Sequence, residues 1–328
     1  MSKLILAVPS KGRLEENAAA LFDKAGIKLK RAGARGYTGA VKGIDNIEVQ
    51  YLSASEIAAR LADGSIHFGI TGEDLLREEV PDLESAVQLV LPLGFGRADV
   101  VVAIPDGWVD VRSMADLAEV AGDFRSQHGK RLRVATKYTQ IAGAFFARHG
   151  LVDFVMVQSF GATEAAPNSG AAEAIVDITS TGATLVANGL RVPDDGVMLK
   201  SEASLAAAVR ADWSGEARAA SKRLLARLAA YQRAQDLVQI NLSTDDKAAV
   251  NASDIRDIAA RFDALEDNEF TTGAGESSFY DFQVPSAYQD DFIEAMLGIG
   301  FARAGVAKLD FVYEKRNPLY ERLMGAVR

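Results

Sequence analysis

The stretch "AAEAIVDITSTGATLVANGL", Ala171 to Leu190, decides the fold. An apolar run ends at a single acid, small hydroxyl-bearing residues follow, and an apolar pattern then resumes. This order predicts a buried strand, a tight loop and the start of a helix. The N–H groups at a helix N-terminus attract phosphate, and small residues let a phosphate approach the backbone. Four hydroxyl residues exceed what a helix cap needs, namely Thr179, Ser180, Thr181 and Thr184.

Two further segments share this design of strand, short loop and helix start. "AVPSKGRLEEN" carries Lys11 and Arg13, which could hold a pyrophosphate, and "RVATKYTQIA" carries Lys137 and Tyr138, whose ring could stack on a base. Ligands of open α/β folds gather at the carboxyl ends of strands, where all three loops are expected. Asp177 could accept hydrogen bonds from ribose hydroxyls, which together with a phosphate loop indicates a phosphorylated ribose. Each loop taken alone is more often structural, since Asp177 could only cap its turn and Tyr138 could only pack.

Composition narrows the class of protein. The chain has 328 residues, 48% hydrophobic and 25% charged, which is typical of a soluble globular protein of two or three domains. The net charge of −9 disfavours general nucleic-acid or membrane binding. With no cysteine, a disulfide scaffold, a thiolate zinc site and a cysteine nucleophile are excluded. The apolar run at the N-terminus is too short for a signal peptide, so the cytoplasm is the expected compartment.

Strands and helices alternate through the first two thirds of the chain, which predicts a parallel α/β architecture. We expect two lobes, with the chain crossing from one to the other near Arg97 and returning near Leu190. After a charged amphipathic helix, the order of elements becomes βαββαβ, the pattern of a ferredoxin-like domain. That order needs a strand near the segment "NEFTTGAGESS", which looks like an insert, and the chain closes on a short helix in "NPLYERLMGAV".

The motifs resemble, in the same order, those of the ATP phosphoribosyltransferase family, the first enzyme of histidine biosynthesis. The resemblance covers about residues 1–210 and rests on "VPSKGRL", "GITGEDLL", "LGFGRADVVVAIP", "RVATKY", "GATEAAP" and "DITSTGATLVANGL". It implies a two-lobed, periplasmic-binding-protein-like (type II) core. In this family N1 of ATP attacks the anomeric carbon of phosphoribosyl diphosphate and expels pyrophosphate. The Mg²⁺ ion would arrive on the substrate phosphates, since the sequence offers no metal cage made of protein ligands alone.

The resemblance also implies roles for single residues. Lys11, Arg13 and Asp177 would be catalytic, the two cations meeting substrate phosphates and the acid holding the ribose hydroxyls. Glu164 matches a family glutamate near the ribose, although Thr163 replaces the usual aliphatic residue beside it. The full set of expected substrate-binding residues is Glu164, Asp177, Thr179, Ser180, Thr181, Gly182, Ala183, Thr184, Lys137, Tyr138 and Asp74.

Long members of the family carry a ferredoxin-like regulatory domain that binds histidine, whereas short members need a partner subunit. This chain has the long layout, with a C-terminal sequence that diverges from the usual long form. We therefore expect one catalytic lobe at 1–97 plus 190–228, a second lobe at 98–189 carrying the phosphoribosyl diphosphate loop, and a regulatory domain at 229–328. L-histidine is the expected inhibitor, and a homo-hexamer the expected assembly.

Other classes of protein stay open from the sequence. A nucleobase phosphoribosyltransferase of the common type is disfavoured, because its loop strand ends in two adjacent acids and here Val176 precedes Asp177. A non-catalytic solute- or nucleotide-binding protein of the same fold usually carries an export signal, which we do not find. A catalytically inactive regulatory paralogue is disfavoured by the presence of Lys11, Arg13, Asp177 and Thr181.

Overall fold

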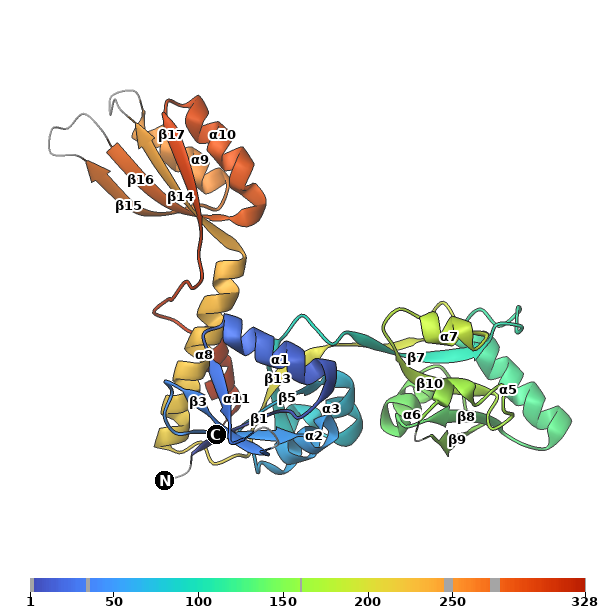
Figure 1. The fold of residues 1–328 in the computed structure, drawn as a ribbon. Coiled ribbons are helices and arrows are strands. Elements are labelled where there is room, and N and C mark those ends of the chain that lie inside the picture. Colours follow the sequence, from blue (N-terminus) through green and yellow to red (C-terminus); the bar gives the residue numbers. More distant parts are fainter. Residues whose placement is uncertain (1–2, 34–35, 160, 245–249, 272–277, 328) are drawn as a thin grey trace. The chain divides into compact units, whose positions relative to one another are not determined.

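The computed structural model describes residues 3–33, 36–159, 161–244, 250–271 and 278–327 (Figure 1). The chain divides into two compact units, the first made of 1–21, 28–221 and 321–328, and the second of 22–27 and 222–320. Helices α1 (Gly12–Lys24), α8 (Gly215–Gln235) and α11 (Pro318–Ala326) each begin in one unit and end in the other. In the described part of the chain, no helix combines the length and the apolar composition needed to cross a bilayer.

The first unit contains a seven-stranded sheet in the order β2-β3-β4-β1-β5-β13-β6. β1 pairs in parallel with β4 and β5, and β13 runs antiparallel between β5 and β6. The leucines of β1 are fully buried, as expected for a central strand covered on both faces. The elements are β1 (Leu4–Pro9), β2 (Lys28–Arg31), β3 (Thr38–Lys42), β4 (Ile47–Leu52), α2 (Ala54–Asp63), β5 (Phe68–Gly72), α3 (Glu73–Glu79), α4 (Leu83–Ala86), β6 (Val87–Pro92) and β13 (Ala203–Ala208).

A second sheet in the same unit has the order β11-β7-β10-β8-β9, with β12 also paired to β7. β8 is parallel to β9 and β10, whereas β10 and β12 run antiparallel to β7. Helices α5 and α6 cover a core of buried aliphatic and aromatic side chains on this sheet. The elements are β7 (Ala98–Pro105), α5 (Met114–His128), β8 (Leu132–Thr136), α6 (Thr139–Arg148), β9 (Phe154–Gln158), η1 (Thr163–Ala165), β10 (Ala174–Thr179), α7 (Ala183–Ala187), β11 (Leu190–Arg191) and β12 (Val197–Ser201).

The point at which the chain returns to the first sheet differs from the sequence expectation. The crossing into the second sheet follows Arg97, as expected, since β7 begins at Ala98. β11 and β12, however, lie after Leu190 and still pair with β7 of the second sheet. The chain re-enters the first sheet with β13 at Ala203. Hydrogen-bond pairing across strands far apart in sequence, which local patterns do not encode, sets this later crossing.

The second unit contains the long helix α8 (Gly215–Gln235) from residue 222 onward and a four-stranded antiparallel sheet in the order β15-β16-β14-β17. Its elements follow as β14 (Leu237–Thr244), α9 (Ala252–Arg261), β15 (Leu265–Thr271), β16 (Ser278–Pro285), η3 (Ser286–Tyr288), α10 (Gln289–Gly298) and β17 (Arg303–Lys308). This is the expected βαββαβ order, and both helices pack on one face of the sheet (Figure 1). Of the segment "NEFTTGAGESS", residues 272–277 lie outside the described residues.

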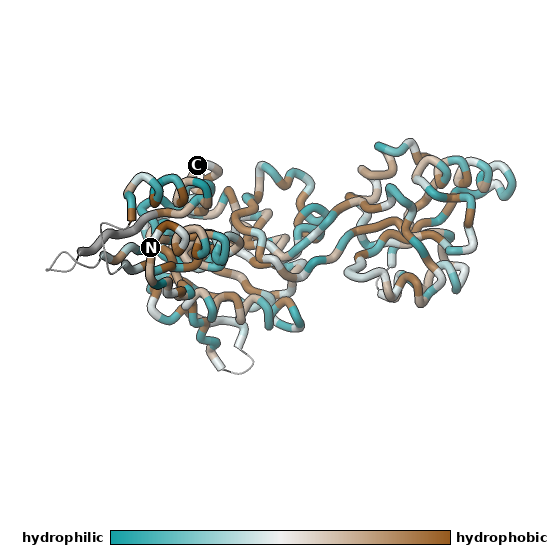
Figure 2. Tube along the Cα trace, turned by 90° about the horizontal axis from the view of Figure 1, so that it is seen from above, coloured by the Kyte–Doolittle hydropathy of each residue, from teal (hydrophilic) through white to brown (hydrophobic). Residues whose placement is uncertain are grey.

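The expected fold class is confirmed: an α/β core with two sheets and a C-terminal ferredoxin-like domain. Figure 2 shows long apolar runs in the interior of the chain trace, whereas helical turns alternate between apolar and hydrophilic residues. Beyond β17 the chain returns beside α8, where Val312 N donates to Ala230 O at 3.0 Å. The guanidinium of Arg227 on α8 donates to Gly26 O, which attaches the loop after α1 to the same helix.

Candidate functional site

A pocket of about 460 Å³ in the first unit joins loops of both sheets. From the first sheet and its helices it takes the start of α1, the β5–α3 turn and the beginning of β13. From the second sheet it takes the crossing segment before β7 and the loop after β10. Three of its lining residues were expected from the sequence, namely Arg13, Asp74 and Ser180.

The loop after β10 has the geometry that its small residues predict. Gly182 has φ +74°, a left-handed conformation that strains any residue with a Cβ, and its N–H donates to Thr179 Oγ1 at 2.9 Å. Thr181 Oγ1 accepts from Ala183 N at 3.4 Å, and Ser180 Oγ donates to the carbonyl of Arg97 at 2.9 Å. The last bond ties the loop to the segment that crosses between the sheets. Five loop positions are exposed or half-buried and open to a ligand: Ser180, Thr181, Gly182, Ala183 and Thr184.

Two acids predicted to bind the ribose lie on different elements. Asp177 is half-buried on β10, and its Oδ1 accepts from Ile178 N at 2.8 Å. Glu164 lies in η1, which follows Ala162, a non-glycine residue at φ +49°. Beside it the side chain of Thr163 is buried and donates to Ser159 Oγ at 3.0 Å. The threonine that replaces an aliphatic residue is thus accommodated by a specific hydrogen bond.

Two cations stand at the start of α1. Lys11 and Arg13 are both exposed, and Gly12 between them has the left-handed φ of +75°. Cations at a helix N-terminus oppose the helix dipole, so their presence there is not explained by helix stability. Arg13 lines the pocket, whereas Lys11 is not among the lining residues. An anionic ligand is the partner that this pair of charges lacks.

The loop after β8 differs from the prediction in a way that matters for the site. Tyr138 is 0% exposed, so its ring is not free to stack on a base as predicted. Its hydroxyl donates to Asp74 Oδ2 at 2.8 Å, and its N–H donates to Thr136 Oγ1 at 2.8 Å. Burial, followed by the negative charge of Asp74, raises the pKa of Tyr138 well above its ordinary value. Lys137 is exposed, with Nζ 4.9 Å from the centroid of the Tyr138 ring.

The N-terminus of α6 is also occupied, so the second of the three predicted phosphate loops is not an open anion site. The carboxylate of Glu78, on α3, accepts from Gln140 N at 3.0 Å and from Ile141 N at 3.1 Å. Thr139 Oγ1 donates to the same carboxylate at 3.1 Å. An acid from a sequence-distant helix therefore fills the position that a phosphate would take.

Most of the other lining residues were not selected by sequence reasoning, and Leu14 and Asn17 on α1 are among them. Asn17 is exposed and follows Arg13 by four positions on α1, so both lie on one face of the helix. That spacing was a signal in the sequence. Arg97 lines the pocket as well; its side chain is 80% exposed, and its Nε lies 4.0 Å from Oε2 of Glu202.

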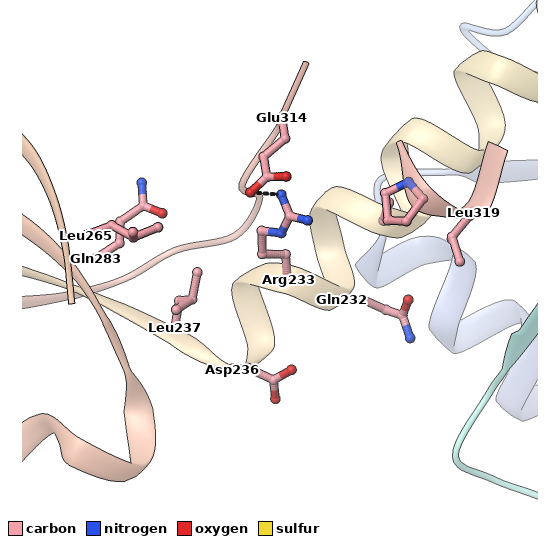
Figure 3. Close-up of a pocket in the computed structure, with 10 residues that line it drawn as sticks. Gln232, Arg233, Asp236, Leu237, Leu265, Gln283, Glu314 and Leu319 are labelled. Carbon is pink, nitrogen blue, oxygen red and sulfur yellow. Dashed lines mark ion pairs between the residues drawn. The ribbon is translucent and has the colours of Figure 1, made fainter. Parts of the chain in front are cut away.

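Other pockets match a phosphorylated ligand less well. A pocket of about 450 Å³ in the second unit is lined by residues of α8, the sheet and the returning segment (Figure 3). Its Arg233 is already ion-paired with Glu314, and Asp236 adds a further negative charge. A pocket at the C-terminal end of α5 has a cluster of basic residues, of which Arg133 is paired with Glu173. Neither pocket is lined by any residue of the predicted site.

Metal ligands do not gather in the described residues. Across 3–33, 36–159, 161–244, 250–271 and 278–327, no group of three or more His, Asp or Glu side chains could hold an ion.

Fold and pocket together define a class: α/β proteins with two sheets whose loops meet at a pocket suited to a small anionic ligand. A family model described as ATP phosphoribosyltransferase matches residues 53–230. Proteins named ATP phosphoribosyltransferase from Rhodopseudomonas palustris (strain BisA53) and Bradyrhizobium sp. (strain ORS 278) are each 48% identical to this chain. They align over 325 and 326 residues, 99% of this chain and 98% of each relative. The chain belongs to the ATP phosphoribosyltransferase family.

Among solved structures, the chain is similar to one titled ATP phosphoribosyl transferase (HisG:HisZ) complex from Thermotoga maritima. The match has a TM-score of 0.52 at 24% identity, and covers 69% of this chain and 95% of that one. It supports the fold of the two-sheet core. The two bacterial relatives align along almost their whole length, so the similarity extends through the C-terminal part of this chain.

Proposed function

We propose that this chain transfers the phosphoribosyl group of phosphoribosyl diphosphate to N1 of ATP, the first step of histidine biosynthesis. A bond forms between N1 and the anomeric carbon while the bond from that carbon to the diphosphate oxygen breaks. Diphosphate leaves with the electron pair. Membership of the family supports the reaction. One observation supports placing the reaction in this pocket: Arg13, on α1 beside the first sheet, and Ser180, in the loop after β10 of the second sheet, line the same cavity.

The loop from Thr179 to Thr184 is proposed to bind the 5′-phosphate. It offers exposed hydroxyls and a glycine with left-handed φ, which lets the phosphate reach the backbone. Asp177 is proposed to accept hydrogen bonds from the ribose hydroxyls, with Glu164 as a second acid on the same side. As the anomeric carbon gains positive charge, fixed carboxylates nearby would stabilise it.

Lys11 and Arg13 are proposed to bind the diphosphate and the triphosphate. Both substrates are anionic, so two exposed cations would reduce their mutual repulsion and hold the leaving group in line. Asp74 and Lys137 are proposed to contact the nucleotide. Asp74 lines the pocket, and Lys137 is exposed and directly precedes Tyr138 in the chain. No protein nucleophile is required, because N1 of the adenine is itself the nucleophile.

Magnesium is proposed to enter as a complex with the substrate phosphates. The described acids do not cluster as a metal site would require. A hard divalent cation bound mainly by phosphate oxygens and water needs no such cluster. Its contribution would be charge neutralisation on the departing diphosphate.

We further propose that residues 1–97 with 203–228 and residues 98–202 act as the two catalytic lobes, the boundary near Leu190 expected from the sequence being moved to Ala203, and that 229–328 act as the regulatory domain. The ferredoxin-like topology of the C-terminal sheet supports inhibition by L-histidine through that domain. A homo-hexamer in the cytoplasm is proposed on the family resemblance alone.

The experiment is an ultraviolet assay of phosphoribosyl-ATP formation. Purified chain is mixed with ATP, phosphoribosyl diphosphate, Mg²⁺ and pyrophosphatase, with and without L-histidine. Activity that histidine suppresses supports both the reaction and the regulation, whereas activity indifferent to histidine removes the regulatory proposal. Folded protein that forms no product contradicts the proposed function.

The assignment of the pocket is tested with Arg13→Gln and Ser180→Ala. Each is expected to lower kcat/KM by roughly 10- to 1,000-fold, because the lost contacts stabilise charge on the substrates. The matched control is Arg60→Gln, which removes a half-buried cation of α2 whose partners are Glu56 and Gln50. Equal activity of Arg13→Gln and the control would move the site away from this pocket.

A further inference from the structure

Helix α3 of the first sheet contacts the start of α6 on the second sheet through two acids. Glu78 accepts hydrogen bonds from three donors of α6, the backbone N–H groups of Gln140 and Ile141 and the hydroxyl of Thr139. The bonds measure 3.0 to 3.1 Å. A carboxylate at a helix N-terminus is favoured by the unpaired N–H groups and by the dipole. Glu78 therefore serves as the N-terminal cap of a helix that belongs to the other sheet.

The second contact is buried. Asp74 accepts from Tyr138 at 2.8 Å and from Ser201 Oγ at 2.9 Å, while its own N–H donates to Ser201 Oγ at 3.0 Å. The side chains of Tyr138 and Ser201 are 0% and 4% exposed, and Asp74 is 8% exposed. Each carboxylate oxygen has a partner, so the buried charge is satisfied. Tyr138 precedes α6, and Ser201 ends β12, so both partners of Asp74 belong to the second sheet.

The two acids are spaced to act together. Asp74 and Glu78 are four residues apart on α3, which places them on the same face of the helix. Two contacts on one helix face resist rotation better than one, because a pivot about either contact breaks the other. Both contacts reach the same short segment, 138–141, at the start of α6.

We propose that Glu78 and Tyr138 are positioning residues that join α3 to α6 and so set the distance between the two halves of the substrate pocket. Gly72, Asp74 and Leu75, at the start of α3, line one side of that pocket. β8, which leads into α6, pairs in parallel with β10, whose loop supplies Ser180 on the other side. The expected effect on kcat rests on the proposed function, whereas the expected effect on the distance between the two sheets does not.

The first test measures distance without requiring activity. The chain has no cysteine, so Ser55→Cys on exposed α2 and Ser126→Cys on exposed α5 provide two unique spin-label sites, one on each sheet's helices. Distances between the labels are measured by pulsed electron resonance in the full chain. Tyr138→Phe and Glu78→Ala are each expected to broaden the distribution relative to the parent. The control Tyr51→Phe, at another buried tyrosine on β4, is expected to leave it unchanged.

A further variant separates positioning from simple helix capping. Glu78→Ala with Thr139→Asp puts a carboxylate back at the N-terminus of α6 but from α6 itself. The proposal predicts that the melting temperature recovers while the broad distance distribution persists. Recovery of a narrow distribution would reduce Glu78 to a cap and overturn the proposal, as would parent-like distributions in both single variants.

Measurements of kcat test whether the contact between α3 and α6 affects the reaction. Tyr138→Phe and Glu78→Ala are expected to lower kcat by about 10- to 100-fold, since an error of about 1 Å in placing reactants can cost that much. The dissociation constant of ribose 5-phosphate, measured by calorimetry, is expected to change less than threefold, because the loop proposed to bind its phosphate lies on the second sheet alone. An inactive parent with broadened variants would contradict the proposed reaction and leave the structural role supported. An active parent with unchanged kcat in both variants would overturn the positioning role.

Discussion

Replacing the buried histidine of the first unit is expected to change how stability depends on pH. His67 is 4% exposed and uses both ring nitrogens: Nδ1 accepts from Ile5 N at 3.0 Å, and Nε2 lies 2.9 Å from the carbonyl of Asp212. Nδ1 can accept only if it carries no proton, so the folded state holds the neutral ring with its proton on Nε2. Trp213 packs edge-on against the ring, with centroids 5.1 Å apart.

Burial lowers the pKa of His67 below its ordinary value of 6.5, an effect larger than the opposing hydrogen bond to Asp212. Below pH 6.5 the unfolded chain therefore binds a proton that the folded chain resists. The neutral His67 ring therefore makes its full contribution to the free energy of unfolding above the pKa of the unfolded chain, and that contribution is lost as the pH falls through this value. If the folded ring stays neutral throughout, the loss between pH 7.5 and 5.5 amounts to about 1.4 kcal/mol.

The assay is urea unfolding at several pH values between 5.5 and 7.5, for the parent and for His67→Gln. Glutamine keeps a donor and an acceptor but does not titrate. Subtracting the two pH profiles cancels the other titrating groups, including Asp116 and Glu173, whose lowered pKa values act at more acidic pH. Parallel profiles for parent and variant would refute the reasoning, whatever their absolute stabilities.

Three further predictions concern backbone and packing. Gly69→Ala would place Cβ 2.4 Å from Cγ2 of Ile57, so we expect overpacking to lower the free energy of unfolding by about 1–3 kcal/mol in thermal or urea unfolding. The control Gly143→Ala, on α6, places Cβ 3.6 Å from the nearest side-chain atom. It is expected to leave the free energy of unfolding unchanged or to raise it by up to ~1 kcal/mol. Gly182→Ala forces a Cβ into φ +74° and is expected to weaken phosphoribosyl diphosphate binding about tenfold in calorimetry; unchanged affinity would mean that the loop does not need this conformation. Ser113→Ala breaks the capping box of α5 and is expected to lower the free energy of unfolding by about 1 kcal/mol, with no change in the affinity for phosphoribosyl diphosphate.

The local design of the substrate loop was readable from the sequence. A buried run, a single acid and a series of small hydroxyl residues predict a strand, a loop and a helix, and β10 and α7 occupy those positions. The order of elements likewise predicted both the α/β core and the C-terminal βαββαβ domain. Such features depend on the period of the side chains and on turn residues, which are local properties.

Pairing between distant segments was not readable. β13, "ASLAAA", is a short run of small residues that gives no strand signal of its own, yet it lies fully buried between β5 and β6. β12 likewise stays with the second sheet because of its pairing with β7. Sequence periodicity reports which side of an element is buried, but it does not report which element covers that side.

The same limit explains why the sequence left two interpretations of Tyr138 open. Tyr138 and the start of α6 have the local sequence of a ligand-binding turn, so the ring could either stack on a base or pack in the core, and the structure buries it. Asp74 and Glu78, more than sixty residues earlier, take up the hydroxyl and the N–H groups instead. Sequence by itself determined the types of element and the chemistry that each loop offers. Only the tertiary structure decided which of those groups are free for a ligand, because hydrogen-bond partners are chosen by proximity in space.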